Sequence, residues 1–206
     1  MVTSTSDTKE QIISVAERLF AEKGFAGTTL RNVVSEAGVN LAAVNYHFGS
    51  KEELFRAVVA RFARPVVKQE LRRLSEFKAE AELPSIEAIL TAVLQPSLEI
   101  LSEDEGTRLI RAKFMGRCRN EPEPIQGIAN QEFAAATEGF LDLLQRVLPD
   151  QSRSQLRWKL DLVITTLIRV LTEAGSPQAL LKSNSPEHIR ETTQHLVRFL
   201  TPGMRS

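Results

Sequence analysis

Apolar residues recur with a helical period along almost the whole chain, and this pattern most constrains the fold. Ile12, Ile13, Ala16, Leu19 and Phe20 lie on one face of a helix with 3.6 residues per turn. Similar patterns return up to the C-terminus, and no segment alternates apolar and polar residues as a half-buried strand does. The sequence therefore predicts an all-α protein, with about nine helices between its breaks.

Glycines and capping residues divide the N-terminal quarter into short helices. Gly24 and Gly38 can adopt the positive φ that ends a helix, whereas Thr28 or Thr29, and then Asn40, can accept amide hydrogen bonds at helix starts. The expected elements are a helix that ends at Lys23, the helices Leu30–Ala37 and Leu41–Phe48, and a fourth helix opened by the capping box Ser50-Lys51-Glu52-Glu53.

Prolines and serines mark the later breaks. Pro65 falls inside the apolar pattern of the fourth helix, so we expect it to kink or end that helix. The further expected elements are a helix from Ser85 to about Leu101, a capping box at Ser102-Glu103-Asp104-Glu105, a long helix from about Ile125 to Leu148, a helix opened by Ser152 and Gln155, and a last helix opened by Ser185-Pro186.

Composition excludes several protein classes. The chain has 206 residues, 26 Lys and Arg against 26 Asp and Glu, and one cysteine, so it cannot form an internal disulfide. No run of 18 apolar residues suggests a membrane span, and the polar N-terminus lacks the apolar core of a signal peptide. We expect a soluble, cytoplasmic protein without a membrane partner. Residues 1–73 carry 11 basic and 8 acidic side chains, a bias too small to indicate nucleic acid by itself.

Two of the expected short helices match a helix-turn-helix. Helices 30–37 and 41–48 are joined by Gly38-Val39-Asn40 and follow a longer helix, as in a three-helix DNA-binding unit. Val33, Val34 and Ala37 give the first an apolar inner face, and Leu41 or Val44 with Phe48 gives one to the second. Small outward residues let a helix enter the major groove, and an asparagine can read adenine. The outward residues are Ala42, Ala43, Asn45, Tyr46 and His47.

Residues 12–58 resemble the DNA-binding domain of the TetR (tetracycline repressor-like) family of bacterial regulators. The resemblance is carried by Phe20-Ala21-Glu22-Lys23-Gly24-Phe25, Thr28-Thr29, Ala37-Gly38-Val39, Tyr46-His47-Phe48 and Ser50-Lys51-Glu52-Glu53-Leu54. It implies a homodimer whose helical C-terminal domain binds a small effector, and most family members repress transcription. By the same resemblance, Thr28, Tyr46, His47 and Lys51 would hold the DNA backbone, while Leu41, Ala42, Ala43 and Asn45 would face the bases. Thr29 and Asn40 complete the expected DNA-binding set. The family commonly has a larger residue at position 45, so the operator sequence is left open.

The middle helices are expected to hold the effector. Aromatic and deformable apolar residues are typical of ligand pockets, although plain core packing explains each residue as well. The expected pocket residues are Leu94, Leu98, Phe114, Met115, Phe133 and Phe140. Five nearby cations form either a solvated basic face or an anion site: Arg108, Arg111, Lys113, Arg117 and Arg119.

The last two helices are expected to form the dimer interface. The helix opened by Ser152 has an apolar arc wider than one neighbour covers, and two such helices from each of two subunits could form a four-helix bundle. The alternative is that both are core helices of a monomer. The expected interface residues are Leu160, Ile164, Leu167, Leu171, Ile189, Leu196 and Phe199.

Cys118 lies between Arg117 and Arg119, whose charges would lower the pKa of its thiol and favour a redox-sensing role. An inert cysteine is the alternative. The histidines at 47, 188 and 195 are dispersed without other ligands at metal spacing, so we expect no metal and no cofactor.

The sequence thus predicts two domains, a DNA-binding domain over residues 1–55 and an effector-binding and dimerisation domain over residues 56–206. The predicted function is a ligand-responsive regulator, most often a repressor in such families, that binds a palindromic operator in double-stranded DNA as a homodimer at the nucleoid. An architectural DNA-binding protein without a ligand is the alternative, and it would need a denser basic surface. A helical enzyme is the second alternative, but no phosphate loop, serine elbow or metal-binding helix appears.

Overall fold

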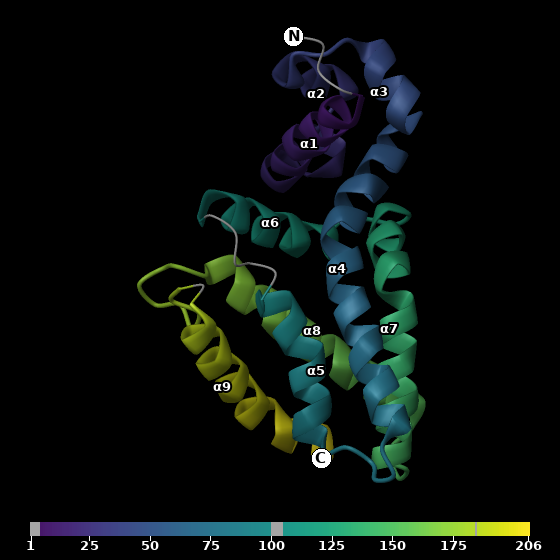
Figure 1. Ribbon diagram of the computed structural model, residues 1–206, viewed down its shortest axis with the longest axis vertical. Coiled ribbons are helices and arrows are strands. Elements are labelled where there is room, and N and C mark those ends of the chain that lie inside the picture. The colour runs from purple at the N-terminus through teal and green to yellow at the C-terminus, as the bar shows by residue number, and fades with distance from the viewer. Residues whose placement is uncertain (1–4, 100–104, 184) are drawn as a thin grey trace. The chain divides into compact units, whose positions relative to one another are not determined.

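The computed structural model describes residues 5–99, 105–183 and 185–206, and their regular structure is entirely helical (Figure 1). The all-α prediction is confirmed. The helices of the described ranges are α1 (Thr5–Gly27), α2 (Leu30–Ala37), α3 (Leu41–Phe48), α4 (Lys51–Ala79), α5 (Ile86–Glu99), α6 (Glu105–Cys118), α7 (Ile125–Val147), α8 (Arg153–Glu173) and α9 (Pro186–Arg205).

Local capping chemistry sets most of the predicted boundaries. Gly24 leaves helical geometry at φ 72°, so the regular part of α1 ends where expected, and Gly38 ends α2 in the left-handed conformation. Ser152 and Gln155 form the predicted reciprocal box at the start of α8. At the start of α4, the Glu53 amide donates to Ser50 Oγ at 3.1 Å, while the Glu53 carboxylate pairs with Arg56. The box predicted at residues 102–105 falls largely outside the described residues.

Pro65 does not end the fourth helix. The helix α4 continues through it to Ala79, and the proline ring is exposed to solvent. A proline inside a helix removes one backbone hydrogen bond, which the long flanking segments of α4 tolerate. Pro96 is accommodated inside α5 in the same way.

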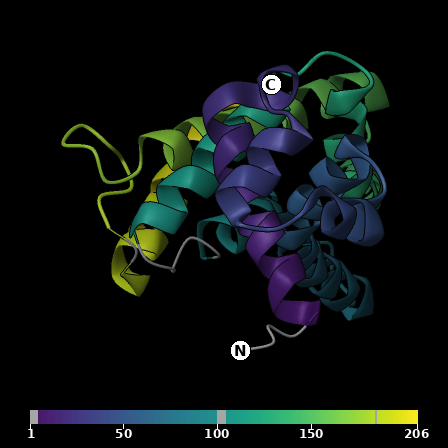
Figure 2. The ribbon, with the colours of Figure 1, turned by 90° about the horizontal axis from the view of Figure 1, so that it is seen from above.

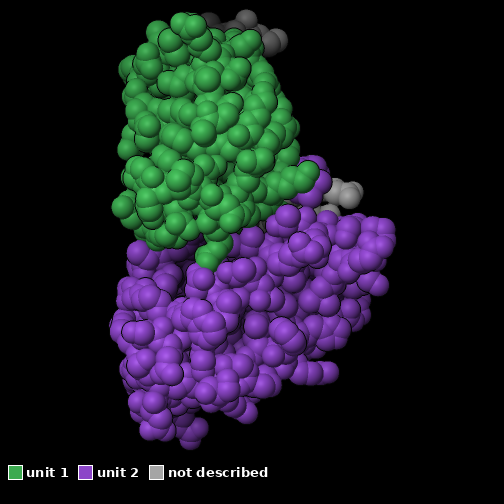
Figure 3. All heavy atoms as spheres, turned by 180° about the vertical axis from the view of Figure 1, so that it is seen from behind, with its two compact units in different colours: residues 1–63, 110–132 green, residues 64–109, 133–206 purple. Residues whose placement is uncertain are grey.

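The chain divides into two compact units (Figure 3). Unit 1 comprises residues 1–63 and 110–132, and unit 2 comprises residues 64–109 and 133–206. The helix α4 leaves unit 1 and α6 returns to it, so the DNA-binding segment shares its unit with a segment from the middle of the chain. The sequence analysis expected a single boundary near residue 55 and did not assign residues 110–132 to the DNA-binding unit.

An aromatic cluster holds unit 1 together. The Phe20 and Phe55 rings meet edge to face with centroids 5.2 Å apart, and Phe114 of α6 lies 5.5 Å from Phe55. Phe25 adds a fourth ring, 5.5 Å from Phe55. These ring contacts hold α1 against the start of α4, and α2 and α3 lie between these two helices in the sequence. Figure 2 shows the N-terminal helices from above.

In unit 2, α5 is the central helix. Nine of its residues are buried, on more than one face, and it packs mainly against α9 and also against α8. The helices α4 and α7 approach closely where Leu74 meets Gly139, since a Cβ atom added to Gly139 would lie 2.6 Å from Leu74 Cδ1. Glycine at this position therefore permits the contact between the two helices.

Candidate nucleic-acid interface

The outer face of α3 is exposed as a DNA-reading helix requires. Val44 and Phe48 are buried beneath it, which resolves the alternative for the inner face in favour of Val44, since Leu41 is exposed. Tyr46 is 81% exposed, an unusual state for an aromatic side chain on a packed domain. Ala42 and Asn45 are also exposed, whereas Ala43 and His47 are half-buried.

Capping bonds occupy two of the expected DNA contacts. The Asn40 side chain accepts from the Ala43 amide at 2.8 Å and so caps α3. The Thr29 hydroxyl accepts from the Asn32 amide at 3.1 Å and donates to the Asn32 side chain at 2.6 Å, which caps α2. These capping bonds position the two helices. Both residues are exposed, so each could contact a phosphate only while it also caps its helix.

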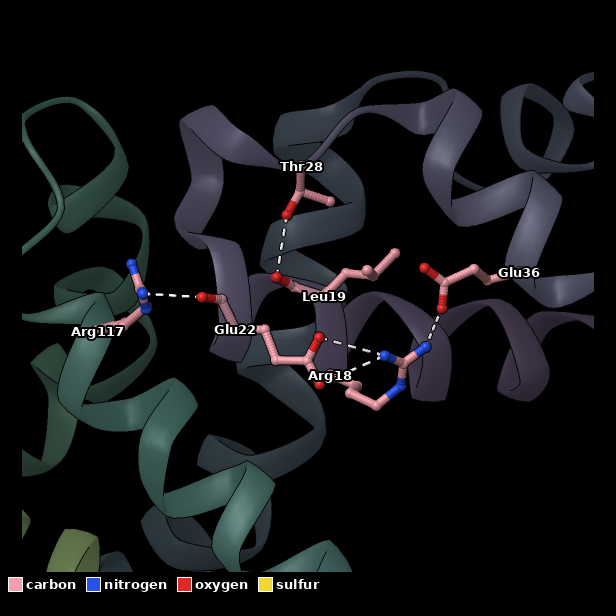
Figure 4. Close-up of polar contacts among 6 residues, drawn as sticks. All are labelled: Arg18, Leu19, Glu22, Thr28, Glu36 and Arg117. Atoms are coloured by element: carbon pink, nitrogen blue, oxygen red, sulfur yellow. Dashed lines mark hydrogen bonds and ion pairs between the residues drawn. The ribbon is translucent and has the colours of Figure 1, made fainter.

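Thr28 does not face the DNA side. It is 1% exposed, and its hydroxyl lies 3.1 Å from the Leu19 carbonyl oxygen of α1 (Figure 4). The Gly24 carbonyl oxygen lies 2.8 Å from the same hydroxyl. The expected backbone contact of Thr28 stays a prediction, and the burial of its side chain weighs against it. Its hydroxyl instead ties the start of the helix-turn-helix to α1, because buried hydroxyls need partners.

Lys51 lies at the start of α4, where helix amides also favour an anion. Its ammonium group stands 4.1 Å from the centroid of the Phe25 ring. Partial burial lowers the pKa of Lys51, while the nearby carboxylates of Glu52 and Glu121 act in the opposite direction. The ring holds the cation in place beside the end of α3, so a phosphate would meet a positioned charge.

A clamp from the α6–α7 region holds the C-terminal end of α1. Arg117 Nη2 donates to the Glu22 carbonyl at 2.9 Å (Figure 4). Arg117 Nε donates to the Ala21 carbonyl, also at 2.9 Å. The Glu121 carboxylate accepts from the Phe25 amide at 2.8 Å. Cations favour the negative end of a helix dipole, so Arg117 stabilises the end of the regular part of α1 before the non-helical Gly24. Sequence reasoning had grouped Arg117 with a basic face and missed this contact.

Ion pairs extend the support of α1. Arg18 pairs with Glu22 on its own helix and also with Glu36 of α2, so it links α1 to the helix-turn-helix (Figure 4). Deeper in unit 1, Arg111 Nε lies 3.1 Å from the Glu17 carboxylate, and both side chains are buried. The more exposed Arg61 lies 3.6 Å from the other Glu17 oxygen. The helix-turn-helix therefore rests on a network anchored by α6.

Comparisons with known proteins agree with this geometry. Residues 12–58 match the model of bacterial regulatory proteins of the tetR family, and residues 91–203 match a tetracyclin repressor-like C-terminal domain. The chain belongs to the TetR family. It is a DNA-binding regulator of transcription, and the fold and function expected from the sequence are confirmed.

Individual TetR-family relatives match most of the chain. The transcriptional repressor Rv1474c of Mycobacterium tuberculosis is 30% identical over 179 residues, which cover 84% of this chain and 86% of that one. The dual regulator CecR of Shigella flexneri is 26% identical over 66% of this chain, and the match spans 62% of CecR, less than two thirds of its length. The structure of the fatty acid degradation regulator FadR from Bacillus halodurans shares the fold with a TM-score of 0.66, 16% identity and 96% coverage of both chains.

The structure separates the residues expected to line the effector pocket of this TetR-family chain. Phe114 and Met115 are buried in unit 1, where Phe114 belongs to the aromatic cluster. This places Phe114 in the support of the DNA-binding helices, contrary to expectation. Leu94, Leu98 and Phe140 are fully buried in unit 2, and Phe133 is half-buried there.

Most residues expected at the dimer interface are already covered within one chain. Leu160, Leu167, Leu171, Ile189 and Leu196 are buried by their own unit, and Ile164 is half-buried, so only Phe199 is freely exposed. The apolar arc of α8 is wide because α5 and α9 both pack against it. On α8 and α9 themselves, three large apolar side chains are exposed, and we refer to them together as the α8–α9 face: Trp158, Leu162 and Phe199.

Cys118 is a buried free thiol in this structure. It is 1% exposed, and burial raises the pKa of the thiol despite the neighbouring arginines. Arg117 directs its guanidinium to the end of α1. The lowered thiol pKa expected from the neighbouring arginines is therefore wrong, because burial disfavours the thiolate.

Two further findings concern the described residues alone. No helix among them is long and apolar enough to cross a membrane. No group of three or more His, Cys, Asp or Glu side chains within these ranges could hold a metal ion.

One buried carboxyl group predicts a pH dependence of stability. Burial raises the pKa of Glu70 from 4.5 to about 8. Between these values the unfolded chain is ionised while the folded chain keeps its proton, so stability falls as pH rises through this window. Glu70→Gln should remove this slope, which is at most about 1.4 kcal/mol per pH unit. Urea unfolding between about pH 5 and pH 8 measures it. Parallel stability curves for variant and wild type would contradict the assignment.

Proposed function

We propose that this TetR-family regulator represses transcription by binding a palindromic operator as a homodimer at the nucleoid, and that a small effector in unit 2 modulates the binding. The observation that carries the proposal is the exposed face of α3, where Tyr46 and Asn45 project from a helix fixed by caps at both ends. Short, rigid reading helices of this kind dock in the major groove.

The expected contacts divide into two kinds. Ala42, Ala43 and Asn45 belong to the base-reading face, where methyl groups can meet thymine and an amide can read adenine. Tyr46, His47 and Lys51 are suited to phosphate oxygens, which fix the register of a protein on DNA without reading its sequence. Leu41 is the exposed apolar residue at the start of the reading helix.

A second copy supplies the second half-site. Two reading helices must stand about 34 Å apart, or a multiple of it, to address one face of the duplex. The α8–α9 face suits this role because it exposes a tryptophan, a leucine and a phenylalanine, and aromatic residues are enriched in protein interfaces.

Selection of bound fragments from the genome of the source bacterium tests the proposal. At about 150 mM salt, nonspecific phosphate binding is weakened, so a dimeric reader should recover fragments that share two short inverted half-sites. Recovery of fragments without a common sequence would favour an architectural DNA-binding protein and would contradict operator recognition.

Two substitutions should separate the two kinds of contact. Lys51→Ala should weaken binding to operator and random DNA alike and reduce the salt slope by about 1. Asn45→Ala should change the preference at one base pair, by about 1–3 kcal/mol if the amide makes a bidentate contact. Both are measured by fluorescence anisotropy with operator variants over a salt series.

A matched control comes from the same helix. Lys68 is an exposed lysine 17 residues further along α4, in unit 2. Lys68→Ala should leave operator binding unchanged. If Lys51→Ala and Asn45→Ala gave the same loss on all DNA, the division between phosphate and base contacts would be wrong.

A further inference from the structure

The segment between α6 and α7 reaches the start of α4 through one aromatic side chain. The Glu121 carboxylate accepts from the Phe25 amide at 2.8 Å, across 96 residues of sequence. The ring of the same Phe25 carries the Lys51 ammonium group, whose nitrogen stands 4.1 Å from the ring centroid. All three residues belong to unit 1, so one compact unit contains the whole chain of contacts.

Both the backbone and the ring of Phe25 are held in place. Its amide donates to Glu121, and its carbonyl oxygen accepts from the Thr28 amide at 3.2 Å. The ring is stacked on Phe20 with centroids 6.0 Å apart and meets Phe55 edge to face at 5.5 Å. A ring fixed in this way presents its face in a constant position, which a cation–π contact requires.

Gly24 makes the approach of Glu121 possible. A Cβ atom added to this glycine would lie 2.9 Å from Glu121 Oε1 and 3.0 Å from Arg117 Nη1, and its φ of 72° disfavours other residues. Arg117 also holds the last regular turn of α1 through the Glu22 carbonyl (Figure 4). The backbone at Gly24 therefore leaves room for both side chains beside the amide of Phe25.

The charge of Glu121 by itself opposes DNA binding. Partial burial lowers the pKa of Lys51, while the carboxylates of Glu52 and Glu121 act in the opposite direction, so both lie within electrostatic range of the ammonium group. Each carboxylate also repels a phosphate that approaches the same lysine. A purely electrostatic role therefore predicts that removal of either carboxylate strengthens DNA binding. A positioning role predicts weaker binding when the hydrogen bond of Glu121 is lost.

We propose that Glu121 is a positioning residue for DNA binding: its hydrogen bond to the Phe25 amide fixes the ring that holds the Lys51 ammonium group for a backbone phosphate. The inference rests on the proposed function, in which Lys51 contacts a phosphate. Glu121 acts through Phe25 and needs no contact with DNA of its own. Without its hydrogen bond, the lysine has to be ordered when DNA binds, and this ordering lowers the affinity.

Two substitutions of Glu121 separate its hydrogen bond from its charge. Glu121→Ala removes both, and we expect it to weaken binding to a random-sequence DNA duplex by about threefold or more and to lower the salt slope by up to about 1. Glu121→Gln keeps a side-chain oxygen that can accept from the Phe25 amide, so it should bind at least as tightly as wild type. Fluorescence anisotropy over a salt series measures both variants. Equal losses in the two, or a Glu121→Ala protein that binds as tightly as wild type or more tightly, would overturn the proposal.

Glu52→Ala is the matched control for the charge. It removes the other carboxylate near Lys51, whereas the Phe25 amide donates to Glu121. Glu52 is exposed, so we expect the variant to bind the duplex as tightly as wild type or slightly more tightly. Weakened binding by Glu52→Ala would show that loss of either carboxylate is harmful, which would overturn the positioning role.

A double variant tests whether Glu121 acts through Lys51. Lys51→Ala combined with Glu121→Ala should bind within about twofold of Lys51→Ala alone, because the group that Glu121 positions is already absent. Losses that multiply would show that Glu121 supports DNA binding by another route, such as the general stability of α1. That result, or an unchanged affinity of Lys51→Ala itself, would overturn the proposal.

The random-sequence duplex keeps this inference distinct from operator recognition, because phosphate contacts carry no sequence information. If the fragment selection recovers operators while the two Glu121 variants bind DNA alike, operator recognition stands and the positioning role is wrong. If the two variants differ as expected while no common sequence is recovered, the positioning role stands and operator recognition fails.

Discussion

Arg111→Ala is expected to lower the free energy of unfolding by about 3–5 kcal/mol, which is the usual result of breaking one side of a buried ion pair. Arg111 and Glu17 are both buried, and the substitution leaves the Glu17 carboxylate in the interior of unit 1 without its closer cation. Arg61 remains 3.6 Å away but is partly exposed, so it compensates only in part. Urea denaturation followed by circular dichroism measures the loss.

Two controls distinguish the broken pair from a general weakening of α6. Lys113 is exposed on the same helix, so Lys113→Ala should change stability by no more than about 0.5 kcal/mol. Replacing both partners with apolar residues, Glu17→Leu with Arg111→Met, should recover most of the lost stability, because the orphaned charge disappears. If Arg111→Ala stayed within about 1 kcal/mol of wild type, or the double variant were no better than the single one, this account would fail.

The DNA-binding helices could be predicted from the sequence because local chemistry determines them. The caps at Thr29 and Asn40 and the left-handed turn at Gly38 act within three or four residues, so their signals stand next to each other in the chain. The inner face of α3 was left ambiguous between Leu41 and Val44, since both fit the helical period.

Contacts across long sequence separations could not be predicted in this way. Phe114, Arg117 and Glu121 lie more than 50 residues from the α1 and α4 groups they support, and the helical period indicates burial without naming the partner. The hydrogen-bond partner of Thr28 could not be predicted either, although it lies only four residues away in the sequence. Its hydroxyl could face a phosphate or a carbonyl, and only the fold of α1 decides between them.

The predicted dimer-interface residues show the same limit, since most of them are buried within a single chain. The apolar residues of α8 and α9 indicate that both helices are buried by neighbouring elements. They do not indicate whether those elements belong to the same chain or to a second copy. In the structure α5 takes the inner side, which leaves the α8–α9 face. Trp158 and Phe199 lie toward the same end of the helix pair, because Lys159, next to Trp158, donates to the carbonyl of Met204, five residues after Phe199.

Phe199→Arg is expected to convert the protein to a monomer and to weaken operator binding by at least about 100-fold. Phe199 is 76% exposed in the single chain, and an arginine there would bring two like charges together across a two-fold interface. Loss of the dimer removes the second half-site, whose binding is strengthened by the link between the two reading helices. Sedimentation velocity gives the oligomeric state, and anisotropy with one and two half-sites gives the affinity.

The matched control introduces an arginine at an exposed apolar position away from the α8–α9 face. Leu83 is another large exposed apolar residue of unit 2, in the loop between α4 and α5, so Leu83→Arg should leave both the mass and the affinity unchanged. A Phe199→Arg protein that remains dimeric would show that the α8–α9 face is not the interface. A monomer with undiminished operator affinity would show that one reading helix suffices, which would contradict recognition of a palindrome, because a single half-site provides no linked second contact.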